Sequence, residues 1–225
     1  LGKMLSLESP PRRMESYDIS NQGASDIVAS MVVYVDGKPL KRDYRRFKLK
    51  DMDGPDDYAS MEQVLTRRFR RYLDGDEKFA DKPDLLLIDG GHEHVKVARR
   101  VLETLNLDIP AYGMVKDDRH RTRALVHPDG REIGIQSIPA VFALIGQIQE
   151  ETHRFAIEYH RQLQAGHVKT SVLDKISGVG EKRRQQLLKH FKTIKAIKAA
   201  SLEQLQEVVP KNTAQAVYDY FHGGE

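Results

Sequence analysis

The most constraining feature of the sequence is the continuous apolar run at residues 85–88, which ends at Asp89 and a glycine pair. A short run without polar alternation predicts a strand that is buried on both faces of a sheet. Helical spacing follows at about residues 94–105, and an apolar segment at residues 109–115 predicts another strand. Because two strands joined through a helix lie parallel in one sheet, this part of the chain predicts an α/β fold.

An antiparallel meander is predicted before that unit. Residues 13–20 are expected to form a strand, and residues 27–35 are rich in β-branched side chains. Asp36-Gly37 is a hairpin sequence, so residues 41–49 should return as a partner strand with its many basic side chains outward. Apolar residues at helical spacing predict a helix at residues 58–73. The predicted fold is therefore a mixed sheet flanked by helices.

A long helix and a small helical domain are predicted in the C-terminal part. Pro139 opens an amphipathic helix whose pattern breaks near Ala165-Gly166. Short helices are expected beyond it at residues 171–176, 182–191, 201–208 and 213–221. We therefore expect an α/β domain at residues 13–166 and a small all-α domain at residues 167–225.

The first residues are expected to be the remnant of a linker, at residues 1–12. The chain begins at Leu1 rather than at methionine, and Ser9-Pro10-Pro11 resembles the end of a linker. These features suggest a fragment of a longer protein.

Composition excludes several classes of protein. Of 225 residues, 40% are hydrophobic and 31% are charged, and no apolar run approaches the ~18 residues of a membrane span. Cysteine is absent, so disulfides and thiolate metal sites are excluded. With no signal-peptide pattern either, a cytoplasmic location without membrane contact is expected. No Walker loop or dinucleotide fingerprint occurs, so no nucleotide cofactor is expected.

Positive charge is concentrated near the C-terminus. The whole chain carries a net charge of +3, whereas residues 167–225 contain 10 Lys and Arg against 6 Asp and Glu. Residues 169–198 alone contain 9 basic and 2 acidic side chains. A basic patch on a near-neutral protein is the charge pattern of a domain that grips phosphates, although a solvated helix surface explains the charge equally well.

Two aspartates on predicted strands are candidates for chemistry. Asp18 lies near the end of the first strand, and Asp89 closes the most apolar strand. Active sites collect at the carboxyl ends of parallel strands. If the two strands are neighbours, their carboxylates lie close together and repel one another unless a hard cation bridges them. The alternative is structural: Asp89 supports its glycine turn and Asp18 caps a loop.

Other candidates are less specific. His153, on the long helix, could ligate a metal or activate water, but a lone helical histidine is commonly a surface residue. Asp57 lies where acidic residues favour a helix start, and it could also lend a carboxylate. Lys116 and Arg119 belong to a basic loop that either clamps phosphates or is simply solvated.

The strongest local motif is a glycine hairpin near the start of the basic region. Gly178, Val179 and Gly180 allow a tight turn between two helices, so that main-chain N–H groups face outward at a helix start. Lys182, Arg183 and Arg184 follow and add positive charge for a DNA phosphate. The alternative is an ordinary glycine cap between packed helices.

At these motifs the chain resembles the C-terminal half of the UvrC family, the incision subunits of bacterial nucleotide excision repair. The resemblance covers essentially all of the sequence and is specific because many short motifs occur in one order. They are Tyr17-Asp-Ile-Ser20, Val28-Ala-Ser30, Tyr44-Arg-Arg-Phe47, Asp56-Asp-Tyr-Ala59, Leu87-Ile-Asp-Gly-Gly91, His153-Arg-Phe-Ala-Ile157, Tyr159-His-Arg161 and Gly178-Val-Gly180.

The resemblance implies an RNase H-like nuclease domain followed by tandem helix-hairpin-helix motifs. It implies a metal-dependent 5′ cut in double-stranded DNA that carries a lesion, with Mg²⁺ or Mn²⁺ as cofactor and a UvrB–DNA complex as partner. Catalytic and metal-binding roles are implied for Asp18, Asp89 and His153, and a role in incision for Asp57. The family's N-terminal nuclease domain has no counterpart in this sequence, so the full repair reaction is not expected.

The sequence departs from the family pattern at two relevant places. The second hairpin, Val208 to Thr213, is shortened and has no glycine, so it should mainly pack against the first. The basic loop that begins at Lys116 is also altered. A non-catalytic DNA-binding scaffold and a different RNase H-like nuclease remain alternatives, and the number of metal ions is open between one and two.

Overall fold

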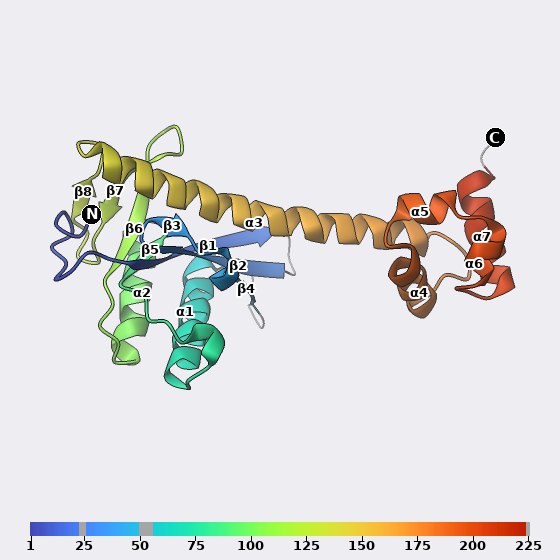
Figure 1. Cartoon of the computed structure of the whole chain (residues 1–225), viewed down its shortest axis with the longest axis horizontal. Helices are drawn as coiled ribbons and strands as arrows, with labels where there is room; N and C mark the ends of the chain where they lie inside the picture. Colours follow the sequence, from blue (N-terminus) through green and yellow to red (C-terminus); the bar gives the residue numbers. More distant parts are fainter. Residues whose placement is uncertain (23–25, 50–55, 224–225) are drawn as a thin grey trace. The chain divides into compact units, whose positions relative to one another are not determined.

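The computed structural model describes residues 1–22, 26–49 and 56–223. The chain forms two compact units, Leu1–Glu158 and Tyr159–Glu225, each of which has its own hydrophobic core (Figure 1).

The first unit is built on a mixed β-sheet. Its strands are β1 (Arg13–Gln22), β2 (Asp26–Val35), β3 (Lys38–Pro39), β4 (Arg45–Lys48), β5 (Leu85–Ile88), β6 (Ala111–Lys116), β7 (Thr122–Val126) and β8 (Glu132–Gly134). Their order is β3-β2-β1-β5-β6-β7-β8, and β4 also pairs with β2. The β1–β2 and β2–β4 pairs are antiparallel, whereas β1–β5 and β5–β6 are parallel. The predicted meander followed by a parallel βαβ unit is therefore confirmed.

Helices cover both faces of this sheet (Figure 1). On one face lie α1 (Asp57–Leu73) and α2 (His92–Thr104), whose apolar sides pack on Tyr17, Ile88 and their neighbours. The first part of α3 (Pro139–Asp174) covers the other face, where its aliphatic side chains meet Met14 and Leu87. Because side chains alternate along a strand, every second residue of β1 faces α3.

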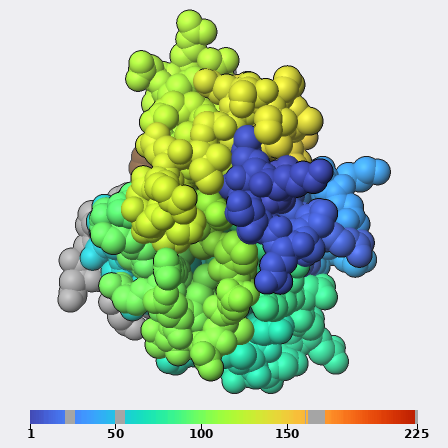
Figure 2. Space-filling model, turned by 90° about the vertical axis from the view of Figure 1, so that its left-hand side faces the viewer, coloured from blue at the N-terminus to red at the C-terminus, as the bar shows by residue number. Residues whose placement is uncertain are grey.

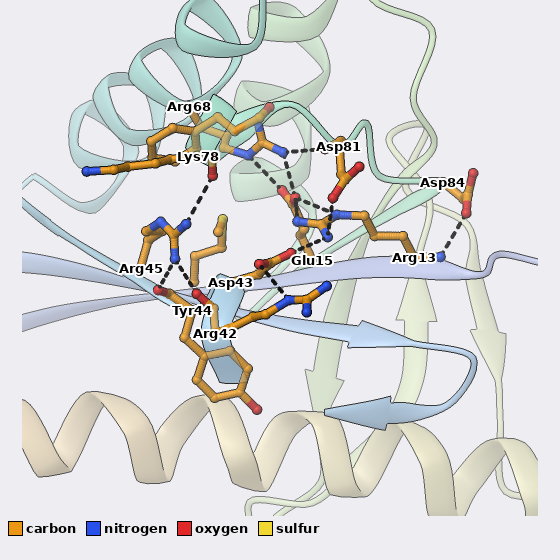
Figure 3. Close-up of polar contacts among 12 residues, drawn as sticks. Arg13, Glu15, Arg42, Asp43, Tyr44, Arg45, Arg68, Lys78, Asp81 and Asp84 are labelled. Atoms are coloured by element: carbon orange, nitrogen blue, oxygen red, sulfur yellow. Dashed lines mark hydrogen bonds and ion pairs between the residues drawn. The ribbon is translucent and has the colours of Figure 1, made fainter. Parts of the chain in front are cut away.

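A buried ionic network lies on the α1 side of β1 (Figure 3). The Arg68 guanidinium is fully buried, and its Nη2 donates to Glu15 Oε1 at 2.7 Å. Tyr17 donates its hydroxyl hydrogen to Glu15 Oε2 at 2.6 Å, and Arg13 lies 3.2 Å from Glu15 Oε1. Buried charges of this kind are tolerated because each is paired and hydrogen-bonded. The network fixes β1 against α1.

The N-terminal segment is part of the first unit, contrary to the expected linker remnant at residues 1–12. Leu5 is buried in the core on the α3 side, and its carbonyl oxygen accepts a hydrogen bond of 3.3 Å from the Tyr112 hydroxyl. Figure 2 shows this segment in dark blue beside the yellow residues at the start of α3. The apolar side chains of Leu1, Met4 and Leu7 also pack against this core. The segment is therefore folded onto the first unit and is not an extended linker.

Two further differences concern element boundaries. The helix that begins at Pro139 does not end near Gly166 but continues to Asp174, because a single glycine costs a helix only about 1 kcal/mol. The division between the units falls at Glu158 and Tyr159, before the expected boundary. The segment after Lys116 is a β-hairpin rather than a loop, since β6, β7 and β8 pair antiparallel in sequence.

The second unit is all-helical. It contains the end of α3 together with α4 (Glu181–Phe191), α5 (Ile194–Ala199), α6 (Leu202–Gln206) and α7 (Lys211–His222). Leu187, Leu205 and Val217 are fully buried in its core. Within the described part of the chain, no helix is both long and apolar enough to cross a membrane.

Candidate active site

The two predicted aspartates occupy neighbouring positions on adjacent parallel strands. Tyr17 of β1 pairs with Ile88 of β5, and the main-chain N–H of Asp89 donates to the Tyr17 carbonyl at 2.9 Å. Asp18 follows Tyr17 on β1, and Asp89 follows Ile88, the last residue of β5. Tyr17 and Ile88 both face α1. The side chains of Asp18 and Asp89 therefore share the face of the sheet that α3 covers. The sequence predicted this pairing only on the condition that the two strands are neighbours, and they are.

The environment of Asp18 makes its ionised form costly. Burial and then the charge of Asp89 raise the pKa of Asp18 from 3.8 to about 7. Asp57 raises it further, whereas Lys116 and a 3.4 Å hydrogen bond from Ser20 lower it. A carboxylate that resists ionisation beside a second carboxylate is a place where a cation is stabilising.

Lys116 belongs to this acidic pair rather than to a loop. It ends β6, the strand beside β5, and its Nζ lies 2.8 Å from Oδ1 and 2.9 Å from Oδ2 of Asp89. Arg119 is exposed on the following turn, where its main-chain N–H donates to Asp117. The structure therefore separates two residues that the sequence had grouped. The sequence does not show that β6 pairs with β5, and this pairing is what places Lys116 beside Asp89.

His153 lies on the part of α3 that crosses β1. The neighbouring Thr152 hydroxyl is 2.9 Å from Ser16 Oγ, two residues before Asp18. The His153 side chain itself is exposed. Within the described residues, no group of three or more His, Asp or Glu side chains has a geometry that could hold a metal ion. The structure thus brings Asp18 and Asp89 together, but it does not place His153 with them as a third metal ligand. The role of His153 stays a prediction.

Asp57 is the first residue of α1 and extends the acidic region. Asp56 caps the helix by accepting from the main-chain N–H groups of Tyr58 and Ala59, both at 3.0 Å. This leaves Asp57 on the first turn, where it contributes to the raised pKa of Asp18. The predicted helix start is confirmed, and Asp57 is close enough to act on the site electrostatically.

The residues present fit a bound divalent cation on chemical grounds. The two carboxylates supply hard oxygen ligands of the type that Mg²⁺ and Mn²⁺ prefer. Ser30 pairs with Asp18 across β1 and β2, and its buried Oγ has no hydrogen-bond partner in the described part of the structure. An unsatisfied polar group beside a carboxylate indicates a site whose polar requirements are incomplete without a ligand.

The glycine hairpin of the second unit has the predicted geometry. Gly178 has φ of +81°, in the left-handed region that favours glycine, and Val179 is buried. Gly180 precedes α4 without any side-chain cap. Arg183 Nη1 donates to the Gly178 carbonyl at 2.7 Å.

Of the basic residues in this hairpin, two brace it. Arg183 closes the turn, and Arg184 forms an ion pair with Asp174. Lys182 is exposed on the first turn of α4. The second hairpin contributes packing, since Val209 and Thr213 are both buried. Binding of DNA by either hairpin stays a prediction.

A mixed sheet with an acidic pair on adjacent parallel strands, followed by hairpin-linked helices, defines an RNase H-like domain joined to a helix-hairpin-helix domain. The model of the UvrC RNase H endonuclease domain matches residues 2–157, and the model of the SAM-like helix-hairpin-helix tandem matches residues 170–221. The chain belongs to the UvrC family.

Curated relatives agree over almost the whole sequence. UvrABC system protein C of Finegoldia magna is 49% identical over 217 residues, which are 94% of this chain and 36% of that protein. The Ruminiclostridium cellulolyticum protein of the same name is 46% identical over 230 residues, 99% of this chain and 37% of the relative. The chain therefore spans little more than a third of the length of these relatives.

Solved structures show more distant similarity. Human ENDOV matches with a TM-score of 0.41 and 15% identity, over 69% of this chain and 87% of that chain. An endonuclease V–DNA complex from Ciona intestinalis matches with a TM-score of 0.36 and 14% identity, over 49% of each chain.

Proposed function

We propose that this chain is the part of a nucleotide excision repair endonuclease that hydrolyses the phosphodiester on the 5′ side of a lesion in double-stranded DNA. The observation that carries the proposal is the pairing of Asp18 and Asp89 on adjacent parallel strands, with the Asp18 pKa raised to about 7. Family membership supports the endonuclease activity.

Asp18 and Asp89 would hold Mg²⁺ or Mn²⁺ through their carboxylate oxygens. When bound, the ion supplies positive charge for the scissile phosphate and lowers the pKa of a water molecule. Lys116 neutralises Asp89 before the site is loaded, and its ammonium group is then available for a phosphate oxygen. His153 acts as a further ligand or as the base that accepts a proton.

The second unit would grip the DNA backbone. The uncapped start of α4 at Gly180 presents main-chain N–H groups, and the exposed ammonium of Lys182 adds charge beside them. Such contacts do not read sequence, so lesion recognition falls to partners, and we assign the UvrB–DNA complex to that role. No nucleotide cofactor is part of the proposal.

The test is incision of a lesion-bearing duplex by the chain together with its partner proteins, and of plain DNA by the chain alone. Asp18→Ala, Asp89→Ala and His153→Ala should each abolish the 5′ cut while DNA affinity is kept. Wild-type cutting by one variant would remove that residue from the mechanism. If the wild-type chain cuts no DNA in Mg²⁺ or Mn²⁺, it is a binding scaffold instead.

A further inference from the structure

The turn of α3 that carries His153 is held to the sheet by polar and aromatic contacts. Earlier in α3, Val141, Ile145 and Ile148 are buried in an aliphatic core. Between Glu151 and Glu158, polar and aromatic contacts to β1, to Tyr44 and to β4 hold the helix. Directional contacts of this kind fix the rotation of a helix more sharply than aliphatic packing does.

Tyr44, the residue before β4, makes two of these contacts. Its hydroxyl donates to Glu151 Oε1 at 3.0 Å, and its ring meets the Phe155 ring edge-on with centroids 5.1 Å apart. Figure 3 shows the Tyr44 side chain reaching toward α3. Glu151 and Phe155 lie on either side of His153 in the sequence, so Tyr44 spans the turn that bears the histidine.

Arg46, two residues further along, packs on the same turn. Its guanidinium carbon lies 3.9 Å from the centre of the Phe155 ring. The Nη2 atom of Arg46 donates to the Phe155 carbonyl at 3.3 Å and lies 3.8 Å from Glu158 Oε2. A planar guanidinium that stacks and donates at once restricts its partner more than a lysine would.

The register of the sheet connects these contacts to the acidic pair. Arg46 of β4 pairs with Ser30 of β2, and Ser30 pairs with Asp18 of β1. On the β1 side, Thr152 Oγ1 lies 2.9 Å from Ser16 Oγ. The His153 turn is thus attached to β1, which carries Asp18, and to β4, which pairs with β2 beside β1.

We propose that Tyr44 and Arg46 are positioning residues that hold the His153 turn of α3 against the face of the sheet on which the acidic pair lies. The role rests on the proposed nuclease function, because the position of His153 matters for activity only if the site is catalytic. A displacement of about 1 Å in a catalytic group can cost on the order of 100-fold in rate. Loss of these contacts should therefore lower kcat and leave DNA binding unchanged.

The experiment compares Arg46→Met, Phe155→Leu, the double variant and the matched control Arg45→Met. Arg45 is the neighbouring residue on the same strand, but it points to the opposite face of the sheet (Figure 3). Its guanidinium donates to the carbonyls of Arg42, Tyr44 and Lys78 at 2.8–3.0 Å. Each of these proteins is labelled with ¹³C,¹⁵N-histidine, and the His153 imidazole resonances are assigned with His153→Gln. Kinetics of Mn²⁺-supported incision are measured in parallel.

The proposal expects Arg46→Met and Phe155→Leu each to shift the His153 resonances and to lower kcat by about 100-fold at constant KM. The double variant should lower kcat by less than the product of the two single effects, because both substitutions remove the stack of Arg46 on Phe155. Arg45→Met should change both readouts far less than Arg46→Met does, because Arg45 contacts Tyr44 only at the main-chain carbonyl and its other hydrogen-bond partners are Arg42 and Lys78 rather than α3. Unchanged His153 resonances in Arg46→Met would overturn the proposal, as would a raised KM with a weaker salt dependence, which indicates a DNA contact.

The experiment distinguishes failure of this proposal from failure of the proposed nuclease function. The histidine resonances report the environment of the His153 side chain even if the wild-type chain does not cut DNA. Should Arg46→Met fail to fold, Tyr44→Phe removes only the hydrogen bond to Glu151. It should still shift the His153 resonances, by less than Phe155→Leu does, and an unshifted spectrum would count against the proposal.

Discussion

The main-chain N–H of Asp89 donates to the carbonyl oxygen of Tyr17 at 2.9 Å, and this bond aligns the acidic pair. It is the last rung of the parallel ladder between β5 and β1, and the side chains of Asp18 and Asp89 follow directly from it. The cost of this alignment is mutual repulsion between two carboxylates in a largely buried place, which a bound cation would relieve.

The first prediction concerns stability and pH. Because the pKa of Asp18 is about 7 in the folded protein against 3.8 ordinarily, its protonated form is favoured on folding. The stability that it contributes is complete below pH ~4 and is lost as the pH rises through ~7. Asp18→Asn should therefore make the metal-free protein more stable at pH 8, by roughly 1 to 3 kcal/mol. Urea denaturation in EDTA at pH 5 and pH 8 measures this, and a variant less stable than wild type at pH 8 contradicts it.

The second prediction separates the two roles of Lys116. Its ammonium group competes with a metal ion for Asp89, so Lys116→Gln should bind Mn²⁺ at least as tightly as wild type. Incision should nevertheless fall by about 100-fold, the usual effect of losing one charge stabiliser at the reacting phosphate. Calorimetric titration and incision kinetics give the two quantities. Weaker Mn²⁺ binding would show that Lys116 supports the metal site instead.

The third prediction concerns the glycine turn behind Asp89. A Cβ on Gly113 of β6 would lie 2.5 Å from the Gly90 carbonyl oxygen and 2.7 Å from Val95 and Val126. Gly113→Ala should therefore displace the turn and destabilise the fold by about 1 to 3 kcal/mol, with loss of incision. Gly134→Ala in β8 is the matched control, since a Cβ there meets nothing within 4 Å. Equal thermal stability of the two variants would refute the close approach.

The fourth prediction distinguishes the two hairpins. Lys182 and Lys211 each lie on the first turn of a helix that follows a hairpin, but only the first hairpin has the glycine geometry. Lys182→Gln should weaken DNA binding and reduce the slope of log K against log salt by about 1, as expected for one lost phosphate contact. Lys211→Gln should leave both unchanged. The assignment fails if Lys211→Gln has the larger effect on the slope.

Much of the fold was predictable because it follows from local periodicity. The apolar run at residues 85–88 predicted a strand that is buried on both faces, and this segment forms β5 at the centre of the sheet. The β7 and β8 strands were missed, because Thr122–Val126 is short and lies within a charged segment. The sequence indicates neither that hairpin nor the short helix α5, since antiparallel pairing and tertiary packing form them.

The site was predictable in part. Asp89 was found because a carboxylate at the end of an apolar strand is unusual, and Asp18 because it lies near the end of the first predicted strand. The register of β1 and β5 then brings the two together. The buried Arg68 could not be found in this way, because on a helix with outward basic residues it looks like a surface residue. Its burial depends on Glu15, which is distant in sequence. The prediction of outward basic side chains also fails at Arg46, which is bound to α3.

The most direct test of the central claim is a crystal structure with Mn²⁺, using anomalous scattering to locate the ion. We predict a peak next to the carboxylates of both Asp18 and Asp89, with the Lys116 ammonium moved away from Asp89. The peak should vanish in Asp18→Asn. An Mn²⁺ peak elsewhere, or none between the two aspartates, in a protein that cuts DNA with Mn²⁺ would contradict the assignment of the site.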